Sequence, residues 1–150
     1  MNDDIKFMSR ALELAHIAAD IGEVPVGAVV VKNGEIIAEG INRRETQKNA
    51  LCHAEIEAIN AACQKLGGWR LVGCKLYVTL EPCPMCAGAI INSRLESVVF
   101  GASDKKCGSV GSIVNLFEFP FNHKPKIVGG VMEDECAEIL KNFFKRLRIK

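Results

Sequence analysis

Two short motifs in this 150-residue chain carry residue types suited to metal chemistry. They are His53-Ala54-Glu55 and Pro82-Cys83-Pro84-Met85-Cys86. Cys83 and Cys86 stand three residues apart, which on a helix puts both sulfurs on one face, close enough to share one ion. Two thiolates and a neutral imidazole balance the charge of Zn2+, and three protein ligands leave the fourth tetrahedral position for water, as in catalytic zinc sites. The spacing therefore predicts a catalytic zinc site at His53, Cys83 and Cys86.

Glu55 is expected beside this metal and not on it. A zinc-bound water loses a proton far more readily than bulk water does, and a neighbouring carboxylate can take that proton and pass it on. His53 and Glu55 are two residues apart, so in a regular helix they would point in different directions. We therefore expect this motif at the irregular first turn of a helix, where both side chains can reach the metal.

Other interpretations of the two cysteines are a redox pair or a structural zinc site. A structural site would need a fourth ligand at close spacing, such as a second cysteine pair, and the sequence has none. Cys52 is the spare candidate, but with Cys52 as a ligand the acid would stand at plus three and not plus two. His16 and His123 are interpreted as ordinary histidines without a metal role. The catalytic interpretation is therefore preferred.

Composition restricts the class of protein. The chain is 49% apolar and 25% charged, and it has no apolar run of the length that a membrane span needs. Seven cysteines without a signal-type N-terminus indicate reduced thiols or metal ligands, so we expect a cytoplasmic protein. The net charge is only +1, yet five cations crowd the last ten residues: Lys141, Lys145, Arg146, Arg148 and Lys150.

Hydrophobic patterns predict one α/β domain over residues 1–150, with strands that alternate with helices. Helices are predicted at about 4–21, 53–66, 82–93 and 133–148, and strands at 26–32, 35–42, 76–80 and 97–100. Asn33-Gly34 makes the first two strands an antiparallel hairpin, and the later strands are expected to be parallel. The buried face of the first helix is expected to hold Ile5, Met8, Leu12, Ala15 and Ala19. Both metal motifs fall where a helix follows a strand, the usual ligand edge of such sheets.

The arrangement H-x-E…P-C-x-x-C is the signature of zinc-dependent nucleobase deaminases. Within that class the chain resembles bacterial tRNA-specific adenosine deaminases of the TadA type, in the cytidine deaminase-like superfamily. The zinc core is shared with cytidine and guanine deaminases, and the segments after Arg94 resemble the tRNA-editing branch. The resemblance is carried by Glu23-Val24-Pro25-Val26-Gly27-Ala28, Asn42, His53-Ala54-Glu55, 76–88, 98–102, Gly108, Gly111-Ser112, Asn122-His123 and Phe143-Phe144.

The resemblance implies a three-layer α/β/α fold with a mixed five-stranded sheet. It also implies a homodimer that hydrolyses adenosine to inosine at the wobble position of a tRNA anticodon arm, with the target base flipped out. The substrate contacts that it implies are Asn42, Ala54, Asp104, Lys106, Phe144 and Arg148. Asn42 suits base recognition because an amide can donate and accept together. Without the resemblance, Asn42 is equally a turn residue, and 104–106 is a solvated loop.

The basic tail has two interpretations. Its cations can simply complement the dipole at the end of a helix. They can also hold tRNA phosphates, and this interpretation is preferred because the charge of the chain is otherwise near neutral. At least one of Phe143 and Phe144 is expected to pack on the domain.

Two positions depart from the family pattern, and two rival functions remain. Ala50-Leu51-Cys52 replaces the common Pro-Thr-Ala, and Cys107 stands where threonine or glycine is common, which leaves pocket shape and oxidation sensitivity open. One rival is a deaminase of free nucleosides or bases, which needs no basic tail. The other is a non-catalytic zinc-stabilised RNA-binding subunit, which needs no proton shuttle such as Glu55.

Overall fold

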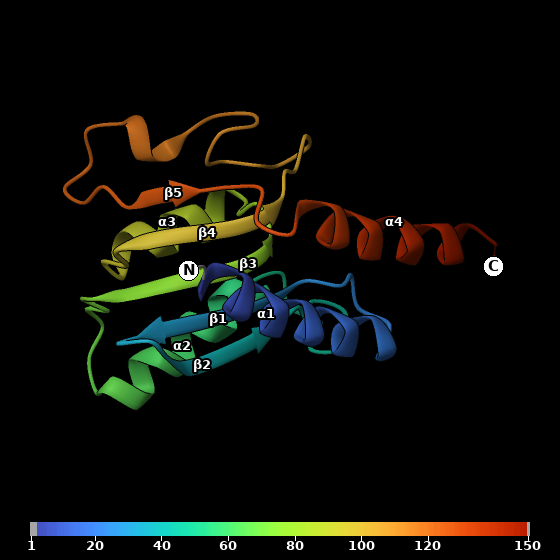
Figure 1. Cartoon of the computed structure of the whole chain (residues 1–150), viewed down its shortest axis with the longest axis horizontal. Helices are drawn as coiled ribbons and strands as arrows, with labels where there is room; N and C mark the ends of the chain where they lie inside the picture. Colours follow the sequence, from blue (N-terminus) through green and yellow to red (C-terminus); the bar gives the residue numbers. More distant parts are fainter. Residues whose placement is uncertain (1–2, 150) are drawn as a thin grey trace.

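The computed structural model describes residues 3–149 and contains one sheet covered by helices (Figure 1). The helices are α1 (Asp3–Asp20), α2 (Ala54–Leu66), α3 (Pro84–Asn92), the short 3-10 helix η1 (Leu116–Glu118) and α4 (Glu133–Ile149). The strands are β1 (Gly27–Lys32), β2 (Glu35–Ile41), β3 (Cys74–Leu80), β4 (Ser97–Ala102) and β5 (Lys126–Val128).

The sheet is five-stranded and mixed, in the order β2-β1-β3-β4-β5. β1 runs antiparallel to both β2 and β3, whereas β3, β4 and β5 are parallel to one another. The turn between β1 and β2 has positive φ at Asn33 (53°) and Gly34 (76°), as a tight hairpin requires. The predicted hairpin, the later parallel strands and the mixed sheet are therefore confirmed.

Alternation along each strand divides the core into two layers. On β1, Ala28 and Val30 face the side covered by α2 and α3, and Val29 and Val31 face the side covered by α1 and α4. Buried alanines of α2 and the apolar face of α3 complete the first layer, while aromatic and aliphatic residues of α1 and Cys136 of α4 complete the second. The result is the expected three-layer α/β/α arrangement (Figure 1).

The predicted buried face of α1 is wrong in part. Met8 and Ala15 are buried as expected, but Ile5 is 51% exposed. Leu12 and Ala19 are half-buried beside α4. The 3–4 spacing of apolar residues describes two neighbouring stripes on this helix, and periodicity alone does not say which stripe meets the sheet. The stripe that packs on the sheet consists of Phe7, Met8, Ala11, Leu14, Ala15 and Ala18.

The fifth strand had no predicted position. β5 spans only Lys126–Val128, and Val128 is 43% exposed because the strand lies at the edge of the sheet. Three residues with one partly buried side chain leave too short an alternation to detect.

α4 packs on the sheet through its first part and then extends beyond it (Figure 1). Cys136, Ile139 and Phe143 are buried, whereas the side chains from 144 to 148 are exposed. Phe143 thus packs on the domain as expected, and Lys150 lies outside the described residues. In the part of the chain that the structure describes, no helix combines the length and apolar character that crossing a membrane requires.

Candidate active site

The two metal motifs occupy equivalent places at the starts of two helices. His53 is the N-cap residue of α2, and Cys83 is the N-cap residue of α3; both have extended backbone conformations. Cys86 lies in the first turn of α3, which begins at Pro84, while Pro82 precedes the N-cap residue Cys83. His53 stands just outside α2, so the regular rotation of side chains along a helix does not turn it away from Glu55. The expected position of the motif at an irregular first turn is therefore found.

The three proposed ligands converge on one point. Their ligand atoms all lie within 4.8 Å of one another, and His53 Nδ1 is 3.6 Å from Sγ of both Cys83 and Cys86. A tetrahedral zinc with Zn–S of about 2.3 Å and Zn–N of about 2.0–2.1 Å separates sulfur from nitrogen by about 3.5 Å. The side chains present thus fit zinc in both chemistry and spacing. Among the described residues, no other such group of three or more histidine, cysteine or acidic side chains occurs.

The two sulfurs differ in their protonation. The hydrogen bond with the Cys86 thiol lowers the pKa of Cys83 to about 4, and the His53 imidazole adds to this effect. The same contact with Cys83, together with burial, raises the pKa of Cys86. Cys83 therefore carries a thiolate at neutral pH, which is the form that binds a divalent metal.

Glu55 lies one residue inside α2 and is only 4% exposed. Burial raises the pKa of this carboxyl group to about 7. A group that titrates close to neutral pH can both accept and release a proton there, which is what general acid–base catalysis requires.

A cavity of about 180 Å³ opens beside this group. This volume is below the roughly 300–1,000 Å³ of pockets for drug-sized ligands, so the cavity suits a single ring system. Its lining includes His53, Glu55 and Cys83 together with three of the predicted substrate contacts, Asn42, Ala54 and Asp104.

The Asn42 amide is held by two backbone groups, one before β1 and one in the loop after β2. Nδ2 donates to the Val24 carbonyl at 3.2 Å, and Oδ1 accepts from the Arg44 N–H at 3.2 Å. An asparagine has two N–H donors and two acceptor lone pairs. One donor and one acceptor position therefore remain for a ligand in the cavity.

The other predicted contacts gather elsewhere. Lys106, Phe144 and Arg148 line a shallow hollow of about 430 Å³ with Leu147, between the 103–107 loop and the end of α4. Asp104 links the two groups, because it lines the cavity while its Oδ1 accepts from the backbone N–H groups of Lys106 and Cys107. The structure thus brings the predicted residues together in two places, the cavity beside Glu55 and a separate basic hollow.

Several cavity residues were not predicted from the sequence. Arg44 and Glu81 line the cavity, with Val24, Val26 and Leu80 as apolar walls. The exposed Cys107, whose bearing on pocket shape the sequence left open, also lines it. The sequence signal for Glu81 is its place between an apolar strand and Pro82-Cys83, where an acidic residue is unusual. Arg44 lies in a loop whose path no local pattern indicates.

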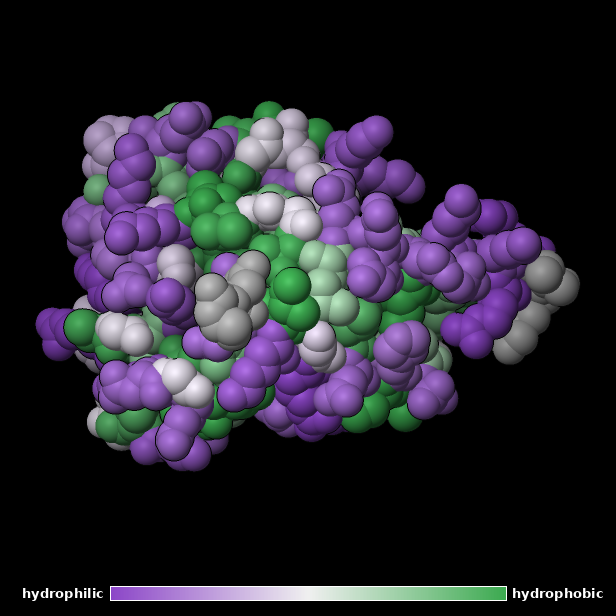
Figure 2. Space-filling model, in the orientation of Figure 1, coloured by the Kyte–Doolittle hydropathy of each residue, from purple (hydrophilic) through white to green (hydrophobic). Residues whose placement is uncertain are grey.

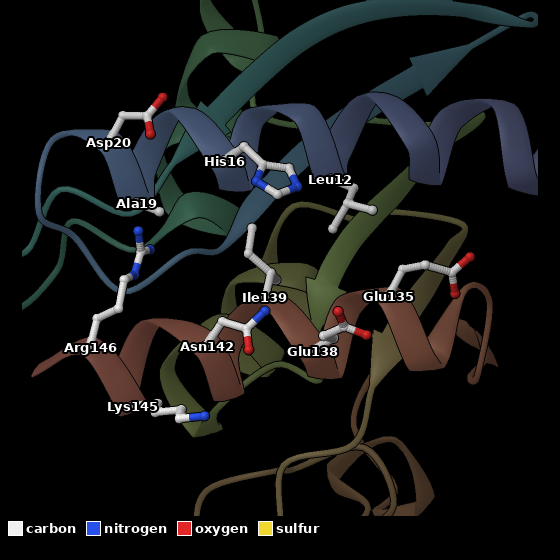
Figure 3. Close-up of a pocket in the computed structure, with 10 residues that line it drawn as sticks. All are labelled: Leu12, His16, Ala19, Asp20, Glu135, Glu138, Ile139, Asn142, Lys145 and Arg146. Atoms are coloured by element: carbon white, nitrogen blue, oxygen red, sulfur yellow. The ribbon is translucent and has the colours of Figure 1, made fainter. Parts of the chain in front are cut away.

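A larger hollow of about 700 Å³ lies between α1 and α4, away from the metal ligands (Figure 3). His16 points into it towards Ile139, and charged side chains from both helices line its rim. The other remote histidine, His123, donates from Nε2 to the Leu95 carbonyl at 2.7 Å. Neither histidine approaches the candidate metal site.

Comparisons with known proteins agree with this chemistry. The family model described as MafB19-like deaminase matches residues 1–148. The tRNA-specific adenosine deaminase of Bacillus subtilis (strain 168) is 53% identical and aligns over 100% of this chain and 94% of its own length. The enzyme of the same name from Haemophilus influenzae is 46% identical over 97% of this chain and 85% of its own length.

Solved structures show the same fold. A structure from studies of A-to-I editing by tRNA:A34 deaminases at the wobble position of transfer RNA superposes with a TM-score of 0.88 and 46% identity. It covers 90% of this chain and 99% of that one. A guanine deaminase from Nitrosomonas europaea superposes with a TM-score of 0.78 at 26% identity, covering 93% of this chain and 83% of that one.

Proposed function

This chain belongs to the deaminase family of the tRNA-specific adenosine deaminases, and we propose that it hydrolyses adenosine to inosine at the wobble position of a tRNA anticodon. The observation that carries the proposal is one small cavity in which the His53, Cys83 and Cys86 ligand set meets the buried carboxyl group of Glu55. Sequence identity of 53% and 46% to tRNA-specific adenosine deaminases, over 100% and 97% of this chain, supports adenosine in tRNA as the substrate.

We propose that the His53, Cys83 and Cys86 set holds zinc. When bound, zinc lowers the pKa of a water molecule so that it becomes a nucleophile near neutral pH. In the overall reaction, water adds oxygen to C6 of the purine, the bond from C6 to the exocyclic nitrogen breaks, and ammonia leaves.

The side chains of this chain supply proton transfer and orientation. Glu55 takes one proton from the attacking water and delivers it to the ring nitrogen; it then takes the second proton of that water from the new hydroxyl group on C6 and delivers it to the leaving amine, for which its pKa of about 7 is suited. Asn42 offers the base its remaining donor and acceptor positions. Ala54, fully buried at the start of α2, forms part of the wall against which the ring lies.

RNA contacts outside the cavity are assigned to the loop and the tail. The cavity takes one base, so the target nucleotide must leave its stack, and single-stranded loops present such bases at low cost. Lys106, Phe144 and Arg148 are the groups for neighbouring nucleotides and phosphates. The projecting end of α4 is covered mostly by hydrophilic side chains (Figure 2).

The experiment is incubation of the zinc-loaded protein with an anticodon stem-loop RNA, with Glu55→Ala as the control, followed by sequencing for A-to-I changes. Conversion of the wobble adenosine by the wild-type protein, but not by Glu55→Ala, supports the proposal. Faster turnover of free guanine or cytidine than of the stem-loop would favour the metabolite enzymes, whose fold this chain shares. Zinc binding with RNA binding but no turnover would leave a non-catalytic subunit.

A homodimer and a cytoplasmic location form part of this proposal. The family resemblance supports the dimer, and exposed apolar side chains next to the candidate site, such as Leu51 at 58%, offer surface for it. Light scattering after gel filtration would distinguish a dimer from the 16.4 kDa monomer. The location follows from the proposed substrate, because bacterial tRNA is modified in the cytoplasm.

A further inference from the structure

Glu81 is a buried carboxylate between the sheet and the metal motif. It follows β3 directly and precedes Cys83 by two residues. Its backbone N–H donates to the Ala102 carbonyl at 2.9 Å, which continues the parallel pairing of β3 with β4 by one step. The residue is only 2% exposed although its side chain reaches the lining of the base cavity.

Four donors from one loop surround this carboxylate. Oε1 accepts from the Asp104 N–H at 3.1 Å and from the Ser112 hydroxyl group. Oε2 accepts from the N–H groups of Val110 at 3.2 Å and Ser112 at 3.0 Å. An ionised carboxylate offers about four acceptor positions, so these bonds use its capacity. Glu81 therefore binds its own loop and leaves no position for a substrate.

The four bonds join both ends of the segment 104–112. Asp104 and Cys107 from this segment line the base cavity, and Lys106 lines the basic hollow. The loop also turns on itself, because the Gly108 N–H donates to the Asp104 carbonyl at 2.8 Å. The place of all three side chains thus depends on where the Glu81 carboxylate holds the backbone.

Gly108 shows how closely the loop approaches this carboxylate. A Cβ atom at position 108 would lie 2.5 Å from Glu81 Oε1 and in collision with the Asp104 carbonyl. Any side chain larger than hydrogen would therefore push the carboxylate and the loop apart. Gly108 and Glu81 form one tightly packed contact.

We propose that Glu81 is a positioning residue for substrate selection: it holds the segment 104–112 so that Asp104 and Lys106 meet the nucleotides next to the target base. This proposal rests on the proposed function, because it assigns a role to a loop beside that same site. Glu81 acts through the loop, while proton transfer stays with Glu55.

The isosteric variant Glu81→Gln makes a directional prediction. The backbone N–H groups of Val110 and Ser112 can only donate, so the amide oxygen must face them. The amide NH2 then faces the Ser112 hydroxyl group, which can rotate to accept, and the Asp104 N–H, which cannot. The variant should therefore break the hydrogen bond at Asp104 and keep the hydrogen bonds at the other end of the segment.

The test measures kcat and KM on anticodon stem-loops that differ only in the nucleotide beside the target adenosine. For Glu81→Gln we expect KM to rise roughly tenfold or more, as loss of a hydrogen bond to a charged group allows. The ratio of kcat/KM between the flanking sequences should fall towards one, while zinc content stays at the wild-type level. Relative to the wild type, amide hydrogen exchange in Glu81→Gln should speed up more at Asp104 than at Val110.

Matched variants separate positioning from general damage. Gly108→Ala should reproduce the loss of flanking preference without any change of charge, and Ser112→Ala should give a smaller effect in the same direction. Glu118→Gln, an exposed glutamate nearby, is the control that should change nothing. If Glu81→Gln does not fold, Gly108→Ala and Ser112→Ala carry the same measurement.

Two failures are distinguishable. Wild-type protein without turnover on any stem-loop would overturn the proposed function, and this proposal with it. Wild-type turnover combined with unchanged KM and unchanged flanking preference in Glu81→Gln and Gly108→Ala would overturn the role of Glu81 alone.

Discussion

His53 and Cys83 hold the same structural position in two different helices. Each is an N-cap residue in extended conformation, and His53 Nδ1 lies 3.6 Å from Cys83 Sγ. The positive ends of α2 and α3 therefore point at one spot, where they favour the thiolate form of Cys83. Two separate stretches of sequence thus build one site, because each places a candidate ligand at the N-cap of a helix.

One zinc ion per chain is the first expectation. Replacing Cys83 or His53 by alanine should reduce the zinc-to-protein ratio well below one, because two ligands hold zinc much more weakly than three. Elemental analysis after dialysis against a weak chelator would measure it. The matched controls are Cys52→Ser and Cys107→Ser, which should keep full zinc content. Loss of metal in Cys52→Ser would mean that the ligand set is different.

Glu55→Ala should retain zinc and the fold but lose turnover by roughly 10²–10⁴-fold, since the role proposed for Glu55 is to move protons and not to ligate the metal. Single-turnover deamination of a stem-loop, alongside circular dichroism and zinc analysis, gives the comparison. Glu118→Gln serves as the control for loss of a negative charge. Near-normal turnover in Glu55→Ala would require another proton shuttle.

Stability at acidic pH should depend on Glu23, a fully buried carboxylate that accepts from the backbone N–H groups of Glu45 and Thr46. Burial raises its pKa, but these hydrogen bonds outweigh burial and lower it from 4.5. The folded pKa is thus below the unfolded value, so the stabilisation is complete above about pH 4.5 and is lost as pH falls through the folded pKa.

Glu23→Gln tests this linkage. Its free energy of unfolding at neutral pH should be lower by about 1–3 kcal/mol, because the amide cannot accept at both positions. Below about pH 4.5 the free energy should also fall less steeply with pH than in the wild type. Urea unfolding at several pH values between 3 and 7 measures both effects. An unchanged acid slope would assign the pH dependence to other carboxylates.

Alanine substitutions at Gly40 and Gly27 compare an effect on the candidate site with an effect on the fold alone. An alanine Cβ at position 40 would collide with the Ala54 carbonyl in α2, whereas one at position 27 would collide with the Ala11 carbonyl in α1. Overpacking of this kind costs typically about 1–3 kcal/mol. We expect both variants to be less stable in urea unfolding, with loss of zinc and kcat greater for Gly40→Ala. Equal zinc affinity and kcat in the two variants would contradict the link between Gly40 and the site.

The basic end of α4 should contribute to RNA binding by neutralising phosphates. Lys145, Arg146 and Arg148 are exposed in the last turns of α4. Replacing all three by glutamine should weaken tRNA binding and reduce the slope of log affinity against log salt by about 0.7–0.9 for each phosphate that the helix no longer neutralises. Filter binding at several salt concentrations, on protein with verified zinc content, gives this slope. An unchanged slope with unchanged affinity would leave this segment as a structural helix.

Local chemistry in the sequence was sufficient to predict that His53, Cys83 and Cys86 come together, and to predict the order of the main elements other than β5. Three local features act within a few residues of chain, so their consequences can be derived without a fold: the spacing of Cys83 and Cys86, Pro84 at the start of α3, and the Asn33-Gly34 turn. The position expected for Glu55, beside the metal and not on it, followed from its two-residue spacing to His53. The mixed five-stranded sheet came from the family resemblance, since β5 has almost no pattern of its own.

Tertiary structure decided which residues surround the candidate metal site and how the predicted substrate contacts are divided between two hollows. Arg44 and Glu81 line the cavity only because loops far apart in sequence meet there, and Lys106 lies with Phe144 and Arg148 instead of with Asn42. The stripe of α1 that packs on the sheet was likewise settled by contact and not by periodicity. Such pairings depend on long-range packing and on the hydrogen bonds of buried carboxylates, whose partners stand 22–31 residues away in the chain and leave no local signal.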